Sequence, residues 1–290
     1  MSPFTHLTPA GTSGKTSSRN QTIELLRIFS ALGIVAFHAH AAGGEYGYAG
    51  LVAFVTISTA MDCKINWHKP RSLATLAQTL LLPWLFWLAI YAALNIIRHK
   101  AAFAEGPVLA QALYGTAGSG KHLWFLPFIF VNLSLLNILK RFAPAAAVFL
   151  PSLIGAAILL FSAGLWRDSS VAWQPPYTQW MQSIAAVLAG CAIGLAPRME
   201  RLGQFTLPLL GAAVVIADRL GERWPLPDTI IQPAAACMFG VYLLHPLMLS
   251  IASKFLGEAS WPSVLAAFFI SFAITWLLRK FVPLSRRVLG

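Results

Sequence analysis

Residues 72–97 read SLATLAQTLLLPWLFWLAIYAALNII, and this stretch contains no Asp, Glu, Lys or Arg. An α-helix needs about 20 residues to cross the hydrocarbon core of a bilayer, so the stretch is long enough to span a membrane. Because a bilayer offers the backbone no water, a spanning segment must satisfy its own polar groups, which a helix does. The stretch therefore predicts a transmembrane helix.

Eight further stretches lack charged residues, and most of them have spanning length. They are 28–44, 46–61, 122–139, 142–166, 169–197, 202–217, 229–253 and 259–278, of which 46–61 and 202–217 are marginal. The alternating strands of about ten residues that are typical of outer-membrane barrels are absent from the sequence. We therefore predict an all-α fold, a polytopic transmembrane helical bundle of about nine to ten spans.

The composition agrees with this class. Hydrophobic residues make up 57% of the chain and charged residues 11%, whereas a soluble domain carries about 25% charged residues. Cys63, Cys191 and Cys237 are far apart in apolar sequence, which excludes a disulfide scaffold. The net charge is +11, but the cations cluster between apolar stretches, so we expect a lipid bilayer as partner and no nucleic acid.

The sequence divides into three parts. Residues 1–20, rich in Ser, Thr, Gly and Pro, predict a disordered cytosolic N-terminal arm; 21–283 predict a single transmembrane domain; and 284–290 form a basic C-terminal tail. A signal peptide is the alternative for the first span, because Ala39 and Ala41 follow an apolar run with small-residue spacing. The many spans that follow favour a retained helix.

The cations predict the topology through the positive-inside rule. With the N-terminus in the cytosol, the basic loops also lie there, with Lys64, Lys69, Arg71, Lys140, Arg141, Arg198 and Arg201. Nine crossings would then leave the last cations outside, against the rule; these are Arg279, Lys280, Arg286 and Arg287. Either a tenth crossing or a re-entrant segment removes the conflict.

The first span carries ionisable residues, which are costly inside a membrane and usually functional. Arg27 and His38 are eleven residues apart, about 16 Å along a helix and on one face of it. We expect Arg27 at the cytosolic boundary and His38 near mid-membrane, facing one cavity, with Glu24 orienting the guanidinium. The alternative is that His38 bonds a neighbouring helix, while Arg27 snorkels to headgroups and forms a solvated ion pair with Glu24.

Two later motifs contain further candidates. HLWFLP (122–127) opens a middle span, and GVYLLHP (240–246) precedes the last span. Taken singly, each is more typical of a structural role, such as an aromatic anchor at the interface. No His-x-x-x-His or Cys-x-x-Cys spacing accompanies these histidines, so no metal site is predicted.

Three motifs, taken in order along the chain, resemble those of the acyltransferase 3 family. They are Arg-x10-His in the first span, His-Leu-Trp-Phe-Leu in a middle span and Gly-Val-Tyr-Leu-Leu-His-Pro before the last span. The resemblance extends from about residue 22 to 282. It implies a multi-pass acyltransferase of the bacterial inner (cytoplasmic) membrane that modifies polysaccharides, O-antigens or related glycans. The chain looks most similar to the branch that O-acetylates exported polysaccharides, including enterobacterial common antigen.

The resemblance carries over only at matching positions. Arg27 and His38 match the family's essential pair, and its later motifs are matched by His122, Trp124, Tyr242 and His245. Two departures concern the donor site: residues 54–60 read FVTISTA where the family usually has Phe-Phe-x-x-Ser-Gly, and its arginine pair before the third span is represented only by Arg71, with Lys69 nearby. The family typically has ten spans, and we expect the missing crossing between 203 and 240.

The implied reaction assigns roles to these residues. A sugar hydroxyl needs a base to attack a thioester, so we expect His38 to be the general base or to carry the acetyl group transiently. Arg27 would bind the phosphates of acetyl-CoA, a cosubstrate rather than a permanently bound cofactor. Donor concentration near the membrane would be raised by Lys64, Lys69 and Arg71. Acceptor positioning or oxyanion stabilisation would fall to His122 and His245.

Two other functions remain open from the sequence. A transporter or flippase for a lipid-linked glycan would also need polar residues within the membrane, although no internal repeat is apparent. A catalytically inactive family member could act as a membrane scaffold. The two substrates implied by the resemblance are acyl-CoA and a glycan or lipid-linked glycan.

Overall fold

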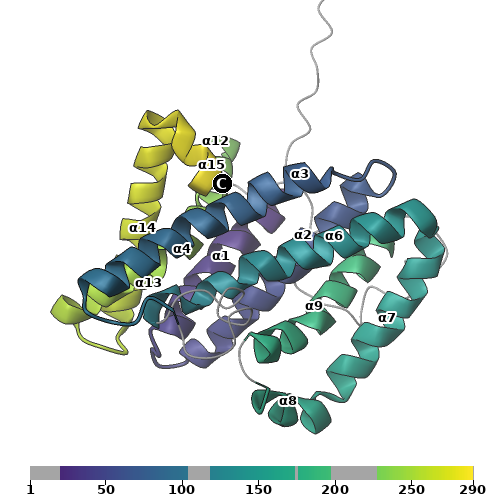
Figure 1. Ribbon diagram of the computed structural model, residues 1–290, viewed down its shortest axis with the longest axis horizontal. Helices are drawn as coiled ribbons and strands as arrows, with labels where there is room; N and C mark the ends of the chain where they lie inside the picture. The colour runs from purple at the N-terminus through teal and green to yellow at the C-terminus, as the bar shows by residue number, and fades with distance from the viewer. Residues whose placement is uncertain (1–19, 104–117, 174–175, 197–226, 290) are drawn as a thin grey trace, which may run out of the picture.

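The computed structural model describes residues 20–103, 118–173, 176–196 and 227–289, and Figure 1 shows their arrangement. Every regular element in these ranges is helical, which confirms the predicted all-α class. The predicted arm at 1–20 lies outside the described residues except for Asn20, whose side chain caps the first helix by accepting from the backbone N–H of Thr22 and Ile23.

The helices follow the apolar stretches of the sequence. They are α1 (Gln21–His38), α2 (Ala49–Asn66), α3 (Leu73–Leu76), α4 (Leu82–Ile97), α6 (Phe125–Phe142), α7 (Ala145–Phe161), α8 (Ala163–Val171), α9 (Tyr177–Leu195), α12 (Asp228–Ala236), α13 (Met238–Leu256), α14 (Trp261–Phe281) and α15 (Arg286–Leu289). The 3₁₀ turns η1 (Gly44–Tyr48) and η3 (Gly118–Trp124) lead into α2 and α6, and η5 (Pro283–Ser285) leads into α15. The turn η2 (Ala77–Leu81) is π-helical and joins α3 to α4.

Seven of these helical segments are long and apolar enough to cross a membrane, and the pair α7 and α8, bent by 76°, would make an eighth. The described residues therefore hold fewer spans than the nine to ten expected. Residues 197–226 lie outside them, so the crossing expected between 203 and 240 falls mostly beyond the described part of the chain.

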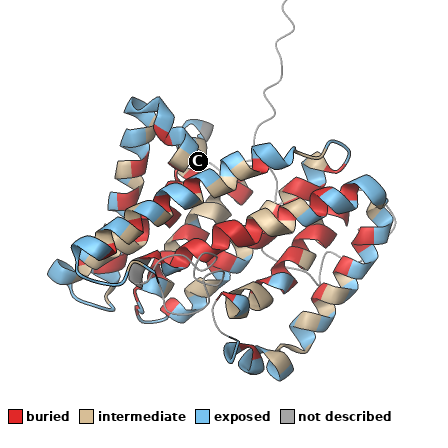
Figure 2. Cartoon of the chain, viewed as in Figure 1, coloured by how far each residue is buried: buried red, intermediate tan, exposed pale blue. Residues whose placement is uncertain are grey.

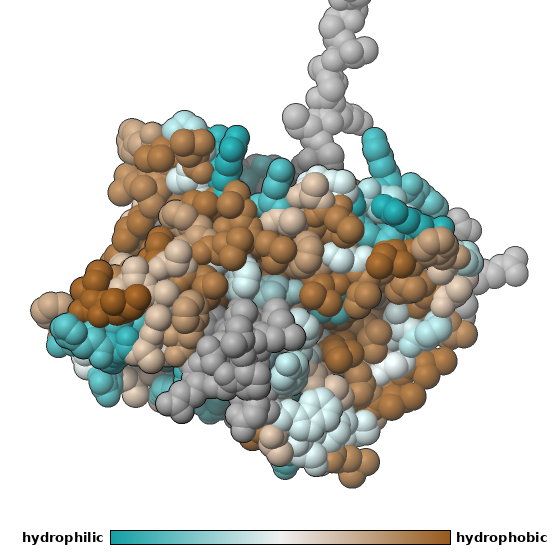
Figure 3. Space-filling model, viewed as in Figure 1, coloured by the Kyte–Doolittle hydropathy of each residue, from teal (hydrophilic) through white to brown (hydrophobic). Residues whose placement is uncertain are grey.

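Exposed apolar side chains cover much of the face of the bundle that Figure 3 shows. Among them Phe161 is 83% exposed, Ile97 73% and Phe269 61%. Patches of this extent mark a surface made for an apolar environment. The buried residues gather instead along the inner helices, most clearly α6 in Figure 2. The chain is a multi-pass membrane protein.

The helix directions define two ends of the bundle. Trp261 Nε1, at the start of α14, donates a hydrogen bond of 3.2 Å to the carbonyl oxygen of Ala42, just beyond the end of α1. The helix α14 therefore runs antiparallel to α1 and ends where α1 begins. We call this end the basic face, because it carries Lys64, Lys69, Arg71, Lys140, Arg141, Arg279 and Lys280. The conflict expected for the last cations does not arise, since the chain returns to the basic face after α14.

The C-terminal tail is folded where it is described. Trp87 Nε1 on α4 donates a hydrogen bond of 3.0 Å to the carbonyl oxygen of Val288, and Leu289 is 1% exposed. Arg286 and Arg287 remain exposed. The end of the tail predicted at 284–290 thus packs against α4 at Val288 and buries Leu289, while Arg286 and Arg287 stay at the surface.

Candidate functional site

Three histidines from distant parts of the chain meet at the end of the bundle opposite the basic face. His38 is the last residue of α1, His122 lies in η3, and His245 lies in α13. The ring centroids are 5.2 Å apart for His38 and His245, 5.4 Å for His122 and His245, and 6.5 Å for His38 and His122. The structure therefore brings together the histidines of all three sequence motifs.

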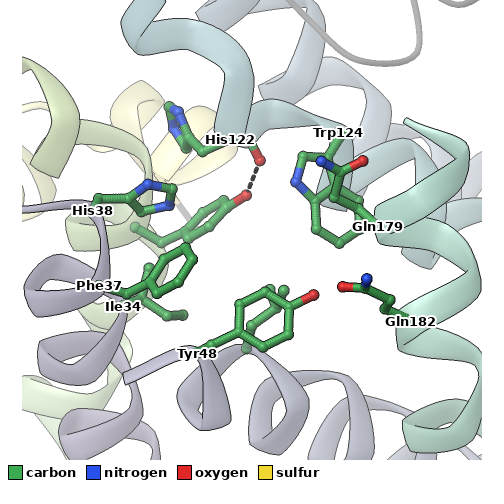
Figure 4. A pocket seen from close by; sticks show the side chains of 10 residues that line it. Ile34, Phe37, His38, Tyr48, His122, Trp124, Gln179 and Gln182 are labelled. Atoms are coloured by element: carbon green, nitrogen blue, oxygen red, sulfur yellow. Dashed lines mark hydrogen bonds between the residues drawn. The ribbon is translucent and has the colours of Figure 1, made fainter. Parts of the chain in front are cut away.

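Two tyrosines anchor this histidine cluster. The Tyr242 hydroxyl donates to the carbonyl oxygen of His122, the contact drawn as a dashed line in Figure 4. The Tyr91 hydroxyl on α4 donates a hydrogen bond of 2.8 Å to the carbonyl oxygen of Leu243, and its ring centroid lies 5.4 Å from that of His122. We did not predict Tyr91 from the sequence. A tyrosine inside an apolar span is itself a signal, because its buried hydroxyl requires a partner.

The hydrogen bond of His245 determines which of its nitrogens can accept a proton. Nδ1 of His245 lies 2.7 Å from the carbonyl oxygen of Tyr242. A carbonyl oxygen only accepts, so Nδ1 carries the hydrogen, and Nε2 of the neutral ring holds the lone pair. Nε2 is buried and has no hydrogen-bond partner among the described residues. It is thus a buried acceptor on the ring next to His38.

Two pockets meet at this cluster. The aromatic pocket, of about 210 Å³, is lined by His38 and His122 together with Phe37, Tyr48, Trp124, Gln179, Gln182 and Tyr242. The polar pocket, of about 550 Å³, is lined by the same two histidines together with His40, Lys121, Ser250, Ser253, Glu258 and Ser263. Because it reaches the turn between α13 and α14, the polar pocket faces the end of the bundle away from the basic face.

His38 is the histidine that a bound ligand can reach. It is exposed although protein surrounds it, because it forms part of the wall of both pockets. His122 is 4% exposed and His245 is fully buried. The His38 ring is therefore the most exposed of the three to a ligand in either pocket.

The predicted common cavity of Arg27 and His38 is wrong for this structure. Neither the aromatic nor the polar pocket is lined by Arg27. Ala31 and Ile34 lie between the two residues on the same helix face and are 2% and 4% exposed, so packed side chains separate the guanidinium from the imidazole. His38 is the last residue of α1, because the chain turns at residues 39–43, where His40 and Gly43 have positive φ.

Arg27 instead lies near the start of α1, on the basic face. Its Nη1 lies 3.0 Å from Oε2 of Glu24, as the i,i+3 spacing predicted. The Glu24 side chain is 7% exposed and that of Arg27 is 31% exposed, so the pair is partly buried rather than fully solvated. This pair lies on the basic face and lines neither pocket.

Arg71 belongs to a separate ionic cluster on the basic face. Its Nη2 lies 2.7 Å from Oδ1 of Asp62, and Lys140 forms a second ion pair with the other carboxylate oxygen. Asn66 Nδ2 donates a further hydrogen bond of 3.1 Å to Oδ1 of Asp62. No role was predicted for Asp62, although an acid at the end of an apolar stretch is a signal that a cationic partner is near.

Metal ligation has no support from this geometry. Within the part of the chain that the structure describes, no group of three or more His, Cys, Asp or Glu side chains is arranged to hold a metal ion. Cys63, Cys191 and Cys237 are free and buried.

Sequence reasoning also missed one wall of the aromatic pocket. Tyr48 in η1 and the two amides of α9, Gln179 and Gln182, lie across the pocket from His38 (Figure 4). The available signal was the i,i+3 spacing of the two glutamines at the start of an apolar span, which places both amides on one face.

Comparisons with known proteins add no assignment. No family model matches the chain, and no curated protein or solved structure is similar enough to be matched to it. The interpretation of the site therefore depends on its geometry and on the three motifs in the sequence.

Proposed function

We propose that this protein is a membrane O-acyltransferase that moves an acetyl or other short acyl group from acyl-CoA to a hydroxyl of a cell-surface or exported glycan. One observation carries the proposal: the three motif histidines form one cluster in which His38 is exposed to two pockets. A ring that ligands can reach and that neighbouring rings hold in place is what general base catalysis requires.

The reaction assigns a proton path to the cluster. As the acceptor oxygen bonds to the thioester carbon, His38 takes the hydroxyl proton. The carbon–sulfur bond then breaks, and the CoA sulfur leaves as the thiol after receiving that proton from His38. Transient transfer of the acyl group to the His38 ring is the alternative course of the same reaction.

The neighbouring residues have positioning and stabilising roles. The Tyr242 hydroxyl donates to the backbone of His122, and its carbonyl oxygen accepts from the His245 ring, so one residue holds both of these segments near His38. The His122 ring lines both pockets and is placed to stabilise the oxyanion that forms as the thioester is attacked. Trp124 forms part of the wall on which the acceptor would rest.

The donor would approach from the basic face, where Arg27 and Glu24 lie. By the positive-inside rule, this face would lie on the cytosolic side of a bacterial inner membrane. Its cations would attract the phosphates of acyl-CoA there. Arg27 is about 16 Å along α1 from His38, a distance comparable with the extended pantetheine arm of CoA. Since Ala31 and Ile34 are packed between them, the proposal requires these side chains to separate when the donor binds.

The test is release of CoA thiol by the purified protein in nanodiscs, with acetyl-CoA and candidate glycans. An acyltransferase releases thiol in proportion to the glycan acetylated. A flippase moves a lipid-linked glycan without consuming acetyl-CoA, and an inactive scaffold does neither. Thiol release that no glycan stimulates would contradict the proposal.

Two variants that each remove one positive charge test the proposed donor site. We expect Arg27→Ala to raise the KM for acetyl-CoA about tenfold or more, because a charge-assisted hydrogen bond to phosphate is lost. Arg98→Ala, at the exposed end of α4 and in neither pocket, is the matched control and should leave this KM unchanged. An Arg27→Ala protein with the wild-type KM for acetyl-CoA would remove this residue from the donor site.

A further inference from the structure

The wall of the aromatic pocket opposite the histidines is built from elements that the three sequence motifs do not contain. Tyr48 comes from η1, and Gln179 and Gln182 come from the first turns of α9. Figure 4 shows these three side chains facing the space in front of His38 and His122. The proposed chemistry uses none of them, so their presence in the wall requires another explanation.

Two polar atoms of this wall are buried without a partner. Oε1 of Gln179 and the hydroxyl of Tyr48 have no hydrogen bond of normal geometry among the described residues, although Ser183 lies near the Tyr48 hydroxyl. Leaving such groups unpaired away from water is costly. A ligand that supplies hydroxyl or amide groups at this wall would satisfy both atoms.

Gln182 is held in place from behind. Its Nε2 donates a hydrogen bond of 3.3 Å to Oγ of Ser170, a buried residue of α8. The bend of 76° between α7 and α8 accompanies this contact. The amide of Gln182 is therefore oriented before any ligand arrives, which reduces the entropy cost of binding.

The charge and size of the pocket restrict the ligand further. No Asp, Glu, Lys or Arg lines the aromatic pocket among the described residues. An anionic group placed there would lose its hydration without meeting a counter-charge. A volume of about 210 Å³ holds several water molecules and suits one small ring rather than the many atoms of CoA. The rings of Phe37, Trp124 and Tyr242 offer apolar surface to the carbon-bound hydrogens of such a ring.

We infer that the aromatic pocket binds one uncharged sugar ring, and that Tyr48 and Gln179 determine its specificity through hydrogen bonds to hydroxyl or acetamido groups of that ring. The inference rests on the proposed function in one respect: the proposed function makes this ring the acceptor of the acyl group. Binding itself does not depend on acyl transfer.

A binding experiment tests the site without turnover. The probes are the methyl glycosides of glucose, N-acetylglucosamine and glucuronic acid, titrated by ligand-observed NMR against the protein in nanodiscs without acetyl-CoA. We expect at least one neutral probe to bind and the glucuronide to bind more weakly. Tyr48→Phe should weaken the neutral probe about three- to tenfold, which corresponds to one hydrogen bond.

Matched controls isolate the pocket from general effects. Tyr46→Phe changes the same residue type in the same turn, but Tyr46 is 79% exposed, so it should bind the probes as the wild type does. Gln179→Leu should weaken binding as Tyr48→Phe does, whereas Gln78→Leu, at an exposed position of η2, should not. Equal affinity in Tyr48→Phe and Tyr46→Phe, or preference for the glucuronide, would overturn the inference.

The two proposals fail in different ways. Sugar binding that Tyr48→Phe weakens, in a protein that releases no CoA thiol, would leave the pocket assignment standing and end the acyltransferase proposal. Glycan-dependent thiol release with the same acceptor KM in Tyr48→Phe, Gln179→Leu and the wild type would support the acyltransferase proposal and end the pocket assignment.

Discussion

The Asp62 carboxylate is a buried charge with three side-chain partners. It is 3% exposed and accepts from Arg71, Lys140 and Asn66, which come from the loop before α3, from α6 and from α2 itself. Lys140 has a fully buried side chain, so Asp62 is the group that compensates its charge. A buried cation of this kind depends strongly on its anionic partner.

We therefore expect Asp62→Asn to destabilise the protein by about 3–5 kcal/mol, because the Lys140 charge is left buried without a counter-charge. The measurement is thermal unfolding in detergent, with Asp168→Asn at an exposed position as the control. Asp62→Asn combined with Lys140→Met should regain part of the loss. An unchanged unfolding temperature in Asp62→Asn alone would show that the cluster is not structural.

The single residues that the structure brings together are those that belong to an ordered motif in the sequence. One cluster contains four of them, although they come from different spans: His38, His122, Tyr242 and His245. The polar wall at Tyr48 and Gln179 was missed because hydrogen bonding across helices depends on packing that no local spacing encodes. The same reason explains why Lys140 was read only as a loop cation, since its partner is 78 residues away along the chain.

Helix packing between α2 and α9 depends on two glycines one turn apart. A Cβ at Gly194 would lie 2.4 Å from the carbonyl oxygen of Ala60, and one at Gly190 would lie 2.7 Å from that of Thr56. Small residues at this spacing let two membrane helices approach closely. The α9 residues that line the aromatic pocket therefore take their position from this contact.

We expect Gly194→Ala to destabilise the protein by about 1–3 kcal/mol, because the added methyl group forces the two backbones apart. Gly164→Ala is the control, since a Cβ there meets nothing within 4 Å and alanine favours a helix. Both variants are compared by thermal unfolding in detergent. A Gly194→Ala protein as stable as Gly164→Ala would contradict the close approach of α2 and α9.

At the scale of elements, the charge-free stretches predicted the existence of the helices better than their limits. The stretch 46–61 looked marginal, yet the helical segment extends over Gly44–Asn66, because the ion pairs of Asp62 allow a charge within a spanning segment. The stretch 142–166 contains both α7 and the start of α8, since missing charge marks apolar sequence but does not mark a bend.

Among the described residues, most of the cations lie toward the basic face, and the histidine cluster lies at the other end. This separation agrees with the positive-inside rule only if the basic face lies in the cytosol. The rule could be applied to the sequence without the structure, but the side of the last cations could not be predicted, because it depends on an exact count of crossings. For the described residues, the contact between Trp261 and Ala42 shows that the last cations lie on the basic face.

Labelling with a membrane-impermeant maleimide tests this orientation. The native cysteines are buried, so new cysteines report their own side. Ser72→Cys and Arg287→Cys, both at exposed positions on or near the basic face, should react in inverted membrane vesicles and not in intact cells. Glu45→Cys, exposed at the other end, should react in intact cells. Labelling of Ser72→Cys and Glu45→Cys from the same side would contradict the arrangement.

The most direct test of the account follows isotope-labelled acetyl groups from acetyl-CoA into the glycan by mass spectrometry, with the purified protein in nanodiscs. We predict that His38→Ala folds normally and transfers acetyl groups at least about 100-fold more slowly than the wild type, as expected for loss of a general base. His68→Ala, at an exposed position that lines neither pocket, should retain the wild-type rate. A His38→Ala protein that acetylates the glycan as fast as His68→Ala would contradict the account.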